Sequence, residues 1–295
     1  MRKWMLVAAG LVLLTGCSRL PEDDYGYKIQ SVEMAPADVA ETNIVSAAKA
    51  EYTYVEDKKG EEYAVEINPE LPQSSFDRSK LKKKKEYYSY GKKSGVGVDV
   101  STFQNTIDWK KVADSGIDFA MIRLGIRGYK TGRLVLDDNF RENIKGAKKN
   151  GLRTGVYFFS QAISREEAEE EADFVLKALK KYKIDGPVAL DSELIDSKNA
   201  RTGDLTREER TDFCIAFCER IEEAGYTPMI YADKAQLLAE LDTERLTDYM
   251  IWYSDFGDKP DYPYEFALWQ YTNKGKVPGI KGNVDLNLWM EFNEE

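Results

Sequence analysis

The chain has 295 residues, 42% of them hydrophobic, which is enough for one large domain with an appended segment. Its formal net charge is −10, and all of this excess lies on residues 94–295, because residues 1–93 hold equal numbers of basic and acidic residues. An acidic body argues against nucleic acid as a partner, since binding to phosphates requires a basic face. Histidine is absent, which excludes Ser-His-Asp and Cys-His catalysis and most zinc sites. Acid–base chemistry therefore falls to carboxylates, and we expect neither a metal nor a cofactor.

The N-terminus has the pattern of an export signal. A basic start precedes an apolar run from Trp4 to Leu14, which is too short to span a membrane as a mature helix. The run ends in Leu14-Thr15-Gly16-Cys17, which resembles a bacterial lipobox. Residues 1–17 are therefore predicted to be a lipoprotein signal peptide, with Cys17 lipidated and the exported protein anchored to the membrane at the bacterial cell surface. The alternatives are an ordinary signal peptide or a buried cysteine.

Two further cysteines, Cys214 and Cys218, lie four positions apart on a predicted helix. Cysteines one helical turn apart do not bridge without unwinding the helix, and a lone pair is no metal site. We therefore expect both to be small core residues.

Residues 18–93 form a lead-in that is acidic at first and rich in lysine later. Two alternating stretches, 52–55 and 63–67, flank a Gly-containing segment and predict a β-hairpin. An isolated hairpin is only marginally stable, so this one is ordered only if it packs on something. Residues 72–93 are polar, with four lysines in a row at 82–85, and predict a solvated linker. The alternative is that the lysines contact anionic lipid or teichoic-type polymers.

From Ser94 onward, strand-like and helix-like stretches alternate, which is typical of a parallel α/β architecture. The predicted strands cover 95–101, 118–124, 154–159, 186–193, 227–231, 249–253, 266–271 and a short stretch around 284–286. Helices are predicted from about 107, over 138–150, from the capping box at 164 and 167 through 181, and from a second capping box at 206 and 209 as far as 225.

Helices separate the early strands and mostly loops separate the late ones. Residues 94–295 are therefore predicted to form an α/β fold, an irregular TIM-like β/α barrel of about five β/α units followed by three short strands. An open flavodoxin-like sheet is the alternative, but no Gly-rich phosphate loop accompanies these strands. In barrels the active site lies at the C-terminal ends of the strands. The pattern assigns Asp99, Asp191, Glu193, Tyr231 and Asp285 to strand ends.

The most informative stretch is Gly186–Glu193, an apolar run closed by two acids. Side chains on a strand alternate between faces, so Asp191 and Glu193 should point the same way, roughly 7 Å apart from Cα to Cα. Two acids held that close have pKa values that move apart, which leaves one as a proton donor and one as a charged stabiliser. This arrangement suits cleavage of a glycosidic bond if the strand opens into a cleft. The alternative is two solvated acids at a strand end or a helix N-cap.

Several short motifs follow one another at the spacing of a single domain. They are Gly97–Ser101 with Ile107–Trp109, Gly155–Ala162, Leu190–Glu193, Gly225–Pro228 with Ile230–Tyr231, Leu268–Tyr271, and Val277–Ile280 with Val284–Asn287. With these motifs in this order, residues 95–290 resemble the glycoside hydrolase family 25 lysozymes, which are N-acetylmuramidases. The lead-in and the lipobox lie outside the resemblance.

The resemblance implies a role for each matching acid. Glu193 is similar to the family's general acid, which protonates the glycosidic oxygen. Asp191 is similar to the partner that orients or stabilises the reacting group, and Asp99 and Asp285 match the two other acids of the cleft. Candidate sugar-contacting aromatic residues are Tyr157, Tyr231, Trp252 and Trp269, with a core or rim position as the alternative for each.

The resemblance therefore implies a lysozyme, or muramidase, that hydrolyses the β-1,4 bond between N-acetylmuramic acid and N-acetylglucosamine, with peptidoglycan glycan strands as its partner. The lipobox adds the expectation that this enzyme is anchored to the membrane. One alternative is a non-catalytic peptidoglycan-binding lipoprotein on the same fold, against which the presence of all four acids argues. A chitinase-like hydrolase is a further alternative, against which the motifs around Asp99 and Asp285 argue.

Overall fold

A computed structural model of the chain describes residues 50–56, 61–85, 87–195, 197 and 199–292. The predicted signal peptide and Cys17 therefore lie outside the described residues. Within the described ranges, no helix is long and apolar enough to cross a membrane.

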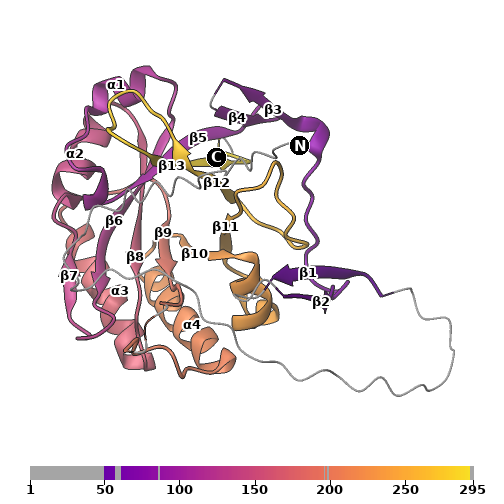
Figure 1. The fold of residues 1–295 in the computed structure, drawn as a ribbon. Helices are drawn as coiled ribbons and strands as arrows, with labels where there is room; N and C mark the ends of the chain where they lie inside the picture. The colour runs from indigo at the N-terminus through magenta and orange to yellow at the C-terminus, as the bar shows by residue number, and fades with distance from the viewer. Residues whose placement is uncertain (1–49, 57–60, 86, 196, 198, 293–295) are drawn as a thin grey trace, which may run out of the picture.

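A closed sheet forms the centre of the molecule (Figure 1). Around the barrel, the strands follow the order β5 (Gly95–Val100), β13 (Val284–Trp289), β12 (Leu268–Gly275), β11 (Met250–Ser254), β10 (Pro228–Asp233), β9 (Val188–Asp191), β8 (Arg153–Phe159) and β6 (Phe119–Arg127). Pairing of β5 with β6 closes the ring, and β7 (Leu134–Leu136) adds to β6 as an outer antiparallel strand. The predicted irregular barrel is confirmed.

Helices follow the early strands of the barrel. They are α1 (Trp109–Asp114), α2 (Phe140–Lys149), α3 (Arg165–Leu179) and α4 (Arg207–Glu223), with short turns η1 (Arg78–Lys80), η2 (Thr102–Gln104), η3 (Gln236–Glu240) and η4 (Thr243–Leu246) elsewhere. The predicted capping box at Thr206 and Glu209 forms with both of its hydrogen bonds. The one at Ser164 forms by half: the side chain of Ser164 accepts from the backbone N of Glu167, but the Glu167 carboxylate accepts from the backbone N of Ile163. Between β11 and Phe292 the structure contains loops and strands only, as the sequence predicts.

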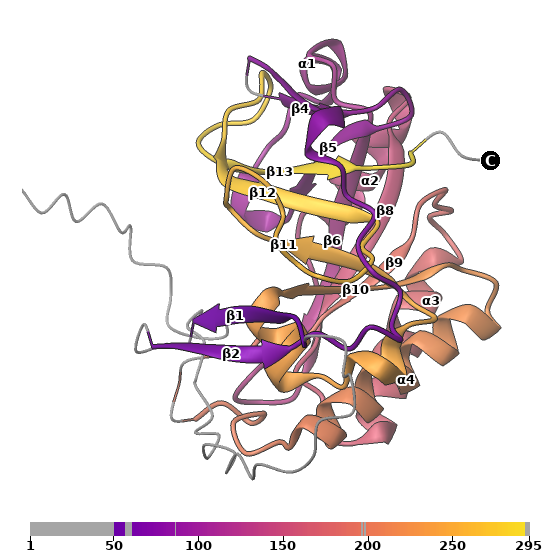
Figure 2. The same cartoon turned by 90° about the vertical axis from the view of Figure 1, so that its right-hand side faces the viewer.

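The last strand reverses direction. β13 runs antiparallel to both of its neighbours, and in Figure 2 its arrow points opposite to those of β10 and β11. Asp285, near the start of β13, is directly opposite Asp99 near the end of β5. The reversal therefore brings the beginning of β13 to the same mouth of the barrel as the C-terminal ends of the parallel strands.

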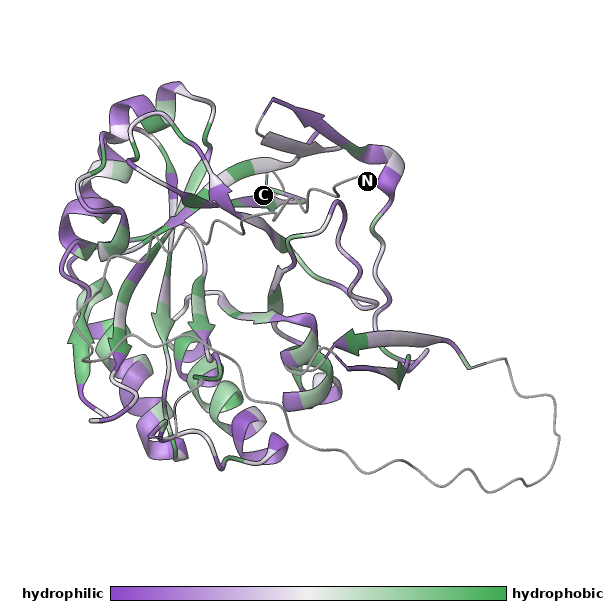
Figure 3. Cartoon of the chain, viewed as in Figure 1, coloured by the Kyte–Doolittle hydropathy of each residue, from purple (hydrophilic) through white to green (hydrophobic). Residues whose placement is uncertain are grey.

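Successive side chains of each strand point alternately into two apolar layers, one inside the barrel and one outside it. Phe119, Met121, Ala189, Met229, Trp252, Leu268 and Trp289 fill the barrel interior, and a larger cluster lies between the sheet and the helices. Figure 3 shows hydrophobic residues along the strands and hydrophilic ones on the outer sides of the helices. Gly97 is required inside, because a Cβ there would lie 2.2 Å from the ring of Phe119.

The two remaining cysteines belong to the outer layer. Cys214 and Cys218 on α4 are free and buried, which confirms their prediction as core residues. Burial raises the pKa of Cys214 to about 12, so its thiol stays protonated and unreactive at neutral pH.

The described part of the lead-in contains the predicted hairpin. β1 (Tyr52–Glu56) pairs antiparallel with β2 (Glu62–Glu66), and the turn between them lies outside the described residues. Val55 is buried in the large apolar cluster, while Tyr52 and Tyr54 on the opposite face are about half exposed. The hairpin is thus ordered because one face packs on the barrel domain.

The prediction of a linker at 72–93 is wrong. β3 (Leu81–Lys84) and β4 (Tyr87–Tyr90) form a second hairpin, and in Figure 1 the lead-in runs along the side of the barrel between the two hairpins. Tyr88 contacts the rings of Trp269 and Tyr271 at 5.4 and 4.9 Å. Phe76 stacks on Tyr90 at 5.2 Å and also approaches Trp269. The segment is rich in exposed lysines, but the aromatic residues between and before them pack on the barrel.

We expect Phe76→Ala to destabilise the whole chain by about 2 kcal/mol, because it removes most of a half-buried aromatic side chain from the contact with the barrel. Tyr52→Ala is the matched control, since Tyr52 is 52% exposed, and should change the free energy of unfolding by less than about 0.5 kcal/mol. Urea unfolding of residues 18–295 measures both. If Phe76→Ala cost no more stability than Tyr52→Ala, the contact of Phe76 with the barrel would contribute nothing to stability.

Candidate active site

Carboxylic acids gather at the mouth of the barrel. Asp99 and Asp285 face each other across the β5–β13 pair. Asp191 ends β9 and is level with Tyr231 on β10. Asp233, two residues further along β10, lies on the same face as Tyr231. The predicted set Asp99, Asp191, Glu193 and Asp285 is brought together, since the charges of these acids raise one another's pKa values.

Glu193 reaches this mouth for a reason that the sequence does not reveal. β9 ends at Asp191, so regular pairing with the neighbouring strands no longer enforces the alternation of side chains two residues later. Glu193 is nevertheless close to Asp233, Tyr231 and Asp99, all of which influence its pKa. Burial first and the charge of Asp233 second raise the pKa of Glu193 to about 7, and the polar hydroxyl of the neighbouring Tyr231 opposes this shift. The side chain stays partly exposed, so a substrate can reach it.

Asp99 is held by two amides. The side-chain nitrogens of Gln270 and Asn287 both donate to Asp99 Oδ2, at 2.9 and 2.8 Å. Burial raises the pKa of Asp99 to about 6, and these two hydrogen bonds oppose the shift because they favour the carboxylate. Among the acids of the mouth, Asp99 is therefore positioned to carry charge near neutral pH.

A second row of donors fixes the direction of both amides. Trp252 Nε1 can only donate, and it does so to Asn287 Oδ1 at 2.8 Å. The hydroxyls of Tyr231 and Ser254 each donate to Gln270 Oε1 at 3.0 Å. With their oxygens engaged in this way, Asn287 and Gln270 must present their NH₂ groups to the carboxylate of Asp99.

The two remaining acids have raised pKa values. Burial first and the charge of Asp99 second raise the pKa of Asp285 to about 8. Burial, followed by the charges of Glu193 and Asp99, raises the pKa of Asp191. The buried Oδ1 of Asp191 has no hydrogen-bond partner within the described structure. A carboxyl group in this setting is poised to stabilise positive charge that appears beside it.

Arg123 on β6 is a buried cation next to these acids. It forms an ion pair with Asp137, in which Arg123 Nε and Nη2 each lie 2.8 Å from Asp137 Oδ2. Its guanidinium carbon lies 5.0 Å from the centre of the Phe103 ring. Its charge lowers the pKa of Asp191 and so partly offsets the effect of burial.

Within the described part of the chain, no group of three or more acidic or cysteine side chains is arranged to hold a metal ion.

The structure divides the four predicted aromatic residues. Tyr157 and Tyr231 are partly exposed at the inner wall of the mouth. Trp252 is buried beneath them, with edge-on ring contacts at 5.9 and 4.9 Å, and it orients Asn287 instead of facing a sugar. Trp269 is fully buried on the outer face of β12, where the lead-in covers it. The prediction of sugar contact is therefore wrong for Trp269. Trp252 contributes to the site through its hydrogen bond to Asn287.

The rim carries apolar side chains that the sequence analysis missed. Phe103 follows β5, Ile163 follows β8 and Phe256 follows β11, and they are 37%, 41% and 53% exposed. All three come directly after strands that end at the mouth. Exposed aromatic faces beside a cluster of acids are suited to stacking against sugar rings.

A cavity of about 640 Å³ lies at the opposite end of the barrel. Gly186 and Thr227, just before β9 and β10, line it together with Phe76 of the lead-in. The apolar interior layer that includes Met121 and Met229 separates this end from the acids. The mouth, and not this cavity, therefore holds the cluster of acids.

Several residues of the site were not predicted, although a signal was present. Asn287 lies two positions after Asp285, and Asp233 two positions after Tyr231, so the period of a strand could have indicated both. Gln270 lies inside the motif Leu268–Tyr271, which is one of those that carry the family resemblance. Arg123 gave no signal, because its role depends on the tertiary approach of β6 to β9 through β8.

The model of glycosyl hydrolases family 25 matches residues 98–280, which include the ends of β5 and β9 and most of the barrel. This chain belongs to glycosyl hydrolases family 25. It is thus a glycoside hydrolase, and the cluster of acids at the barrel mouth lies where an enzyme of this fold carries its active site.

Two relatives and one solved structure illustrate the similarity. The chain is 29% identical over 208 residues to uncharacterized protein YegX of Escherichia coli K12, covering 68% of this chain and 71% of YegX. It is 28% identical over 207 residues to Lysozyme M1 of Streptomyces globisporus, covering 66% of this chain and 67% of that protein. The modular autolysin LytC of Streptococcus pneumoniae superposes with a TM-score of 0.60 and 22% identity over 81% of this chain. This family 25 chain spans only 56% of the length of LytC.

Proposed function

We propose that this family 25 hydrolase is a lysozyme that cleaves the β-1,4 bond between N-acetylmuramic acid and N-acetylglucosamine in peptidoglycan, with Glu193 as its general acid. The observation that carries the proposal is the raised pKa of Glu193, about 7, at a partly exposed position among other acids. A carboxyl group with this pKa still holds its proton near neutral pH and can donate it to a leaving oxygen. The similarity to a protein named a lysozyme supports the choice of substrate.

The neighbouring acids receive complementary roles in this mechanism. As the glycosidic bond breaks, positive charge develops on the sugar ring or its acetamido group. Asp191 stabilises that charge in its carboxylate form, which the charge of the neighbouring Arg123 favours. Asp99, held by its two amide donors, and Asp285 opposite it would orient sugar or water.

The test is digestion of purified peptidoglycan by residues 18–295, followed by borohydride reduction and mass spectrometry of the products. Reduced ends that carry muramitol are expected. Reduced glucosamine ends would mean that the other glycosidic linkage is cut. Retention of the folded protein on the glycan without cleavage would favour a non-catalytic binding protein.

The charge of Asp233 leads to a prediction about how the activity depends on pH. Its charge raises the pKa of Glu193, so Asp233→Asn should lower that pKa and move the basic limb of the activity profile to lower pH. An asparagine keeps the oxygen that accepts from the backbone N of Gln236 at 2.8 Å, so the local fold should survive. Glu142→Gln, an exposed change on α2, is the control and should leave the limb in place. A limb that stays fixed in Asp233→Asn would show that Glu193 does not set it.

The export signal leads to a proposal on location. We infer that Cys17 is lipidated and anchors the enzyme at the cell surface, as its Leu-Thr-Gly-Cys context suggests. Cys17→Ser should release the protein from the membrane fraction and abolish incorporation of labelled fatty acid. A Cys17→Ser protein that remains with the membrane would contradict the proposal.

A further inference from the structure

Three successive backbone carbonyls around the acid pair each accept a hydrogen bond. The carbonyl of Asp191 accepts from the backbone N of Ser160 at 2.7 Å, which continues the β8–β9 ladder. The next carbonyl, that of Ser192, accepts from the side-chain amide of Gln236. The carbonyl of Glu193 accepts from the side-chain amide of Gln161 at 3.0 Å.

The donors come alternately from the two sides of β9. Ser160 and Gln161 follow β8, whereas Gln236 lies on η3 after β10. Successive carbonyls of an extended chain point to opposite sides, so this alternation is that of a strand. Two side-chain amides therefore replace the backbone N–H groups of neighbouring strands that have already ended. They keep residues 192 and 193 extended, which explains why Glu193 faces the same mouth as Asp191.

Gln161 is held at every polar atom. Its backbone N donates to Glu171 at 3.4 Å and its backbone O accepts from Arg201 at 3.3 Å. Its side-chain oxygen accepts from the hydroxyl of Thr202 at 3.0 Å, which leaves the NH₂ group for the carbonyl of Glu193. The residue is 1% exposed, so these hydrogen bonds have no competition from bulk water.

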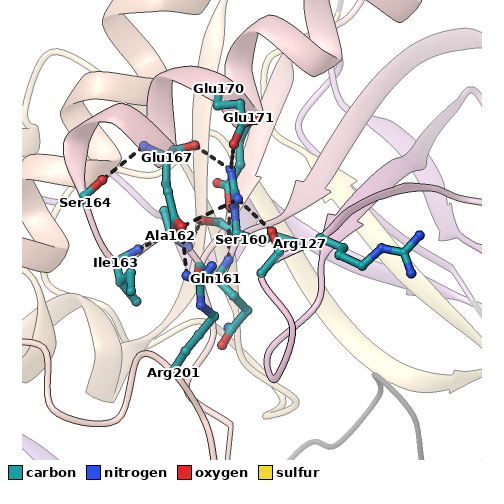
Figure 4. Close-up of polar contacts among 12 residues, drawn as sticks. Arg127, Ser160, Gln161, Ala162, Ile163, Ser164, Glu167, Glu170, Glu171 and Arg201 are labelled. Carbon is teal, nitrogen blue, oxygen red and sulfur yellow. Dashed lines mark hydrogen bonds and ion pairs between the residues drawn. The ribbon is translucent and has the colours of Figure 1, made fainter.

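An ion cluster built around the buried pair Arg127 and Glu171 supports Gln161 (Figure 4). Arg127 at the end of β6 donates to Glu171 at 2.7 Å and to Glu170 at 2.7 Å, and Arg201 donates to Glu167 at 2.8 Å. Arg127 and Glu171 are almost completely buried. The cluster joins β6, the start of α3 and the loop before α4, all of which surround Gln161.

We propose that Gln161 and Gln236 are positioning residues for Glu193, because their side-chain amides extend the β9 ladder past its last regular residue and hold the general acid in register. Neither side chain touches the reacting atoms. The inference rests on the proposed role of Glu193, and it assigns to the Gln161 position a task distinct from that of the acids. Displacement of a catalytic group by about 1 Å can reduce a rate by about 100-fold.

The test compares Gln161→Met and Gln236→Met, which keep the side-chain length but remove the amide. We expect each to lower kcat on soluble glycan fragments by about 10- to 100-fold, with KM changed less than about threefold. The basic limb of the profile should move to lower pH, because a less firmly held Glu193 gains water and its pKa falls. Thr202→Val should act in the same direction, while Thr202→Ser, which retains the hydroxyl, should restore the wild-type rate.

Val175→Ala is the stability control, because Val175 is fully buried on α3, one turn after Glu171, but its apolar side chain makes none of the hydrogen bonds of the polar cluster. It should lower the unfolding temperature without moving kcat or the basic limb. Glutamine variants that lose stability but keep the wild-type kcat and basic limb would overturn the positioning role. Failure of the proposed function looks different: wild-type protein would release no muramitol ends, or Glu193→Gln would remain active.

Discussion

Glu193→Gln is expected to lower kcat on peptidoglycan by at least about 1,000-fold, which corresponds to about 4 kcal/mol of transition-state stabilisation. An amide of the same shape cannot donate the proton that the leaving oxygen requires. The fold should be retained, because burial makes the charged form of Glu193 unfavourable and glutamine is neutral. Turnover measured with soluble glycan fragments, together with the unfolding temperature, checks both parts.

An aryl glycoside with a strongly acidic phenol as leaving group supplies the control. Such a leaving group departs without protonation, so Glu193→Gln should lose far less activity on this substrate than on peptidoglycan. A variant that keeps more than about a tenth of wild-type turnover on peptidoglycan would contradict the role of Glu193 as the general acid. An equal loss on both substrates would mean that Glu193 acts on something other than the leaving oxygen.

Asp191→Asn should lower kcat by about 100- to 1,000-fold, because an amide cannot provide the negative charge that stabilises the reacting group. The loss should appear on peptidoglycan and on the aryl glycoside alike, since both reactions develop positive charge on the sugar. This pattern distinguishes Asp191 from Glu193. A variant that cleaves the aryl glycoside at the wild-type rate would show that Asp191 has no such role.

The same substitution should stabilise the folded enzyme at neutral pH. Burial raises the pKa of Asp191 above its value in the unfolded chain, so its stabilising contribution is complete at low pH and is lost as the pH rises through the folded-state pKa. Asparagine does not ionise and avoids this loss. The unfolding temperature of Asp191→Asn should therefore exceed that of the wild type at pH 7, and the difference should disappear toward pH 4. A difference that does not change with pH would exclude this explanation.

Local patterns predicted much of the barrel. Caps at Ser164 and Thr206 mark the starts of α3 and α4, because the groups that satisfy a helix terminus lie within one turn. The hairpin of β1 and β2 was equally visible, since its alternation and turn are contiguous in the chain. The lead-in between 72 and 93 was misjudged, because its lysines dominate the composition while Tyr88 packs against Trp269 nearly two hundred residues away.

The sequence by itself determined the family, the alternation of strands and helices, and the identity of the four acids, because each depends on residues close together in the chain. Only the tertiary structure decided how these acids are used. The reversal of β13 places Asp285 opposite Asp99, and the amide of Gln161 holds Glu193 in register beyond the end of its strand. Both effects depend on contacts between segments that are distant in sequence, and no local pattern of residue types encodes which of them meet.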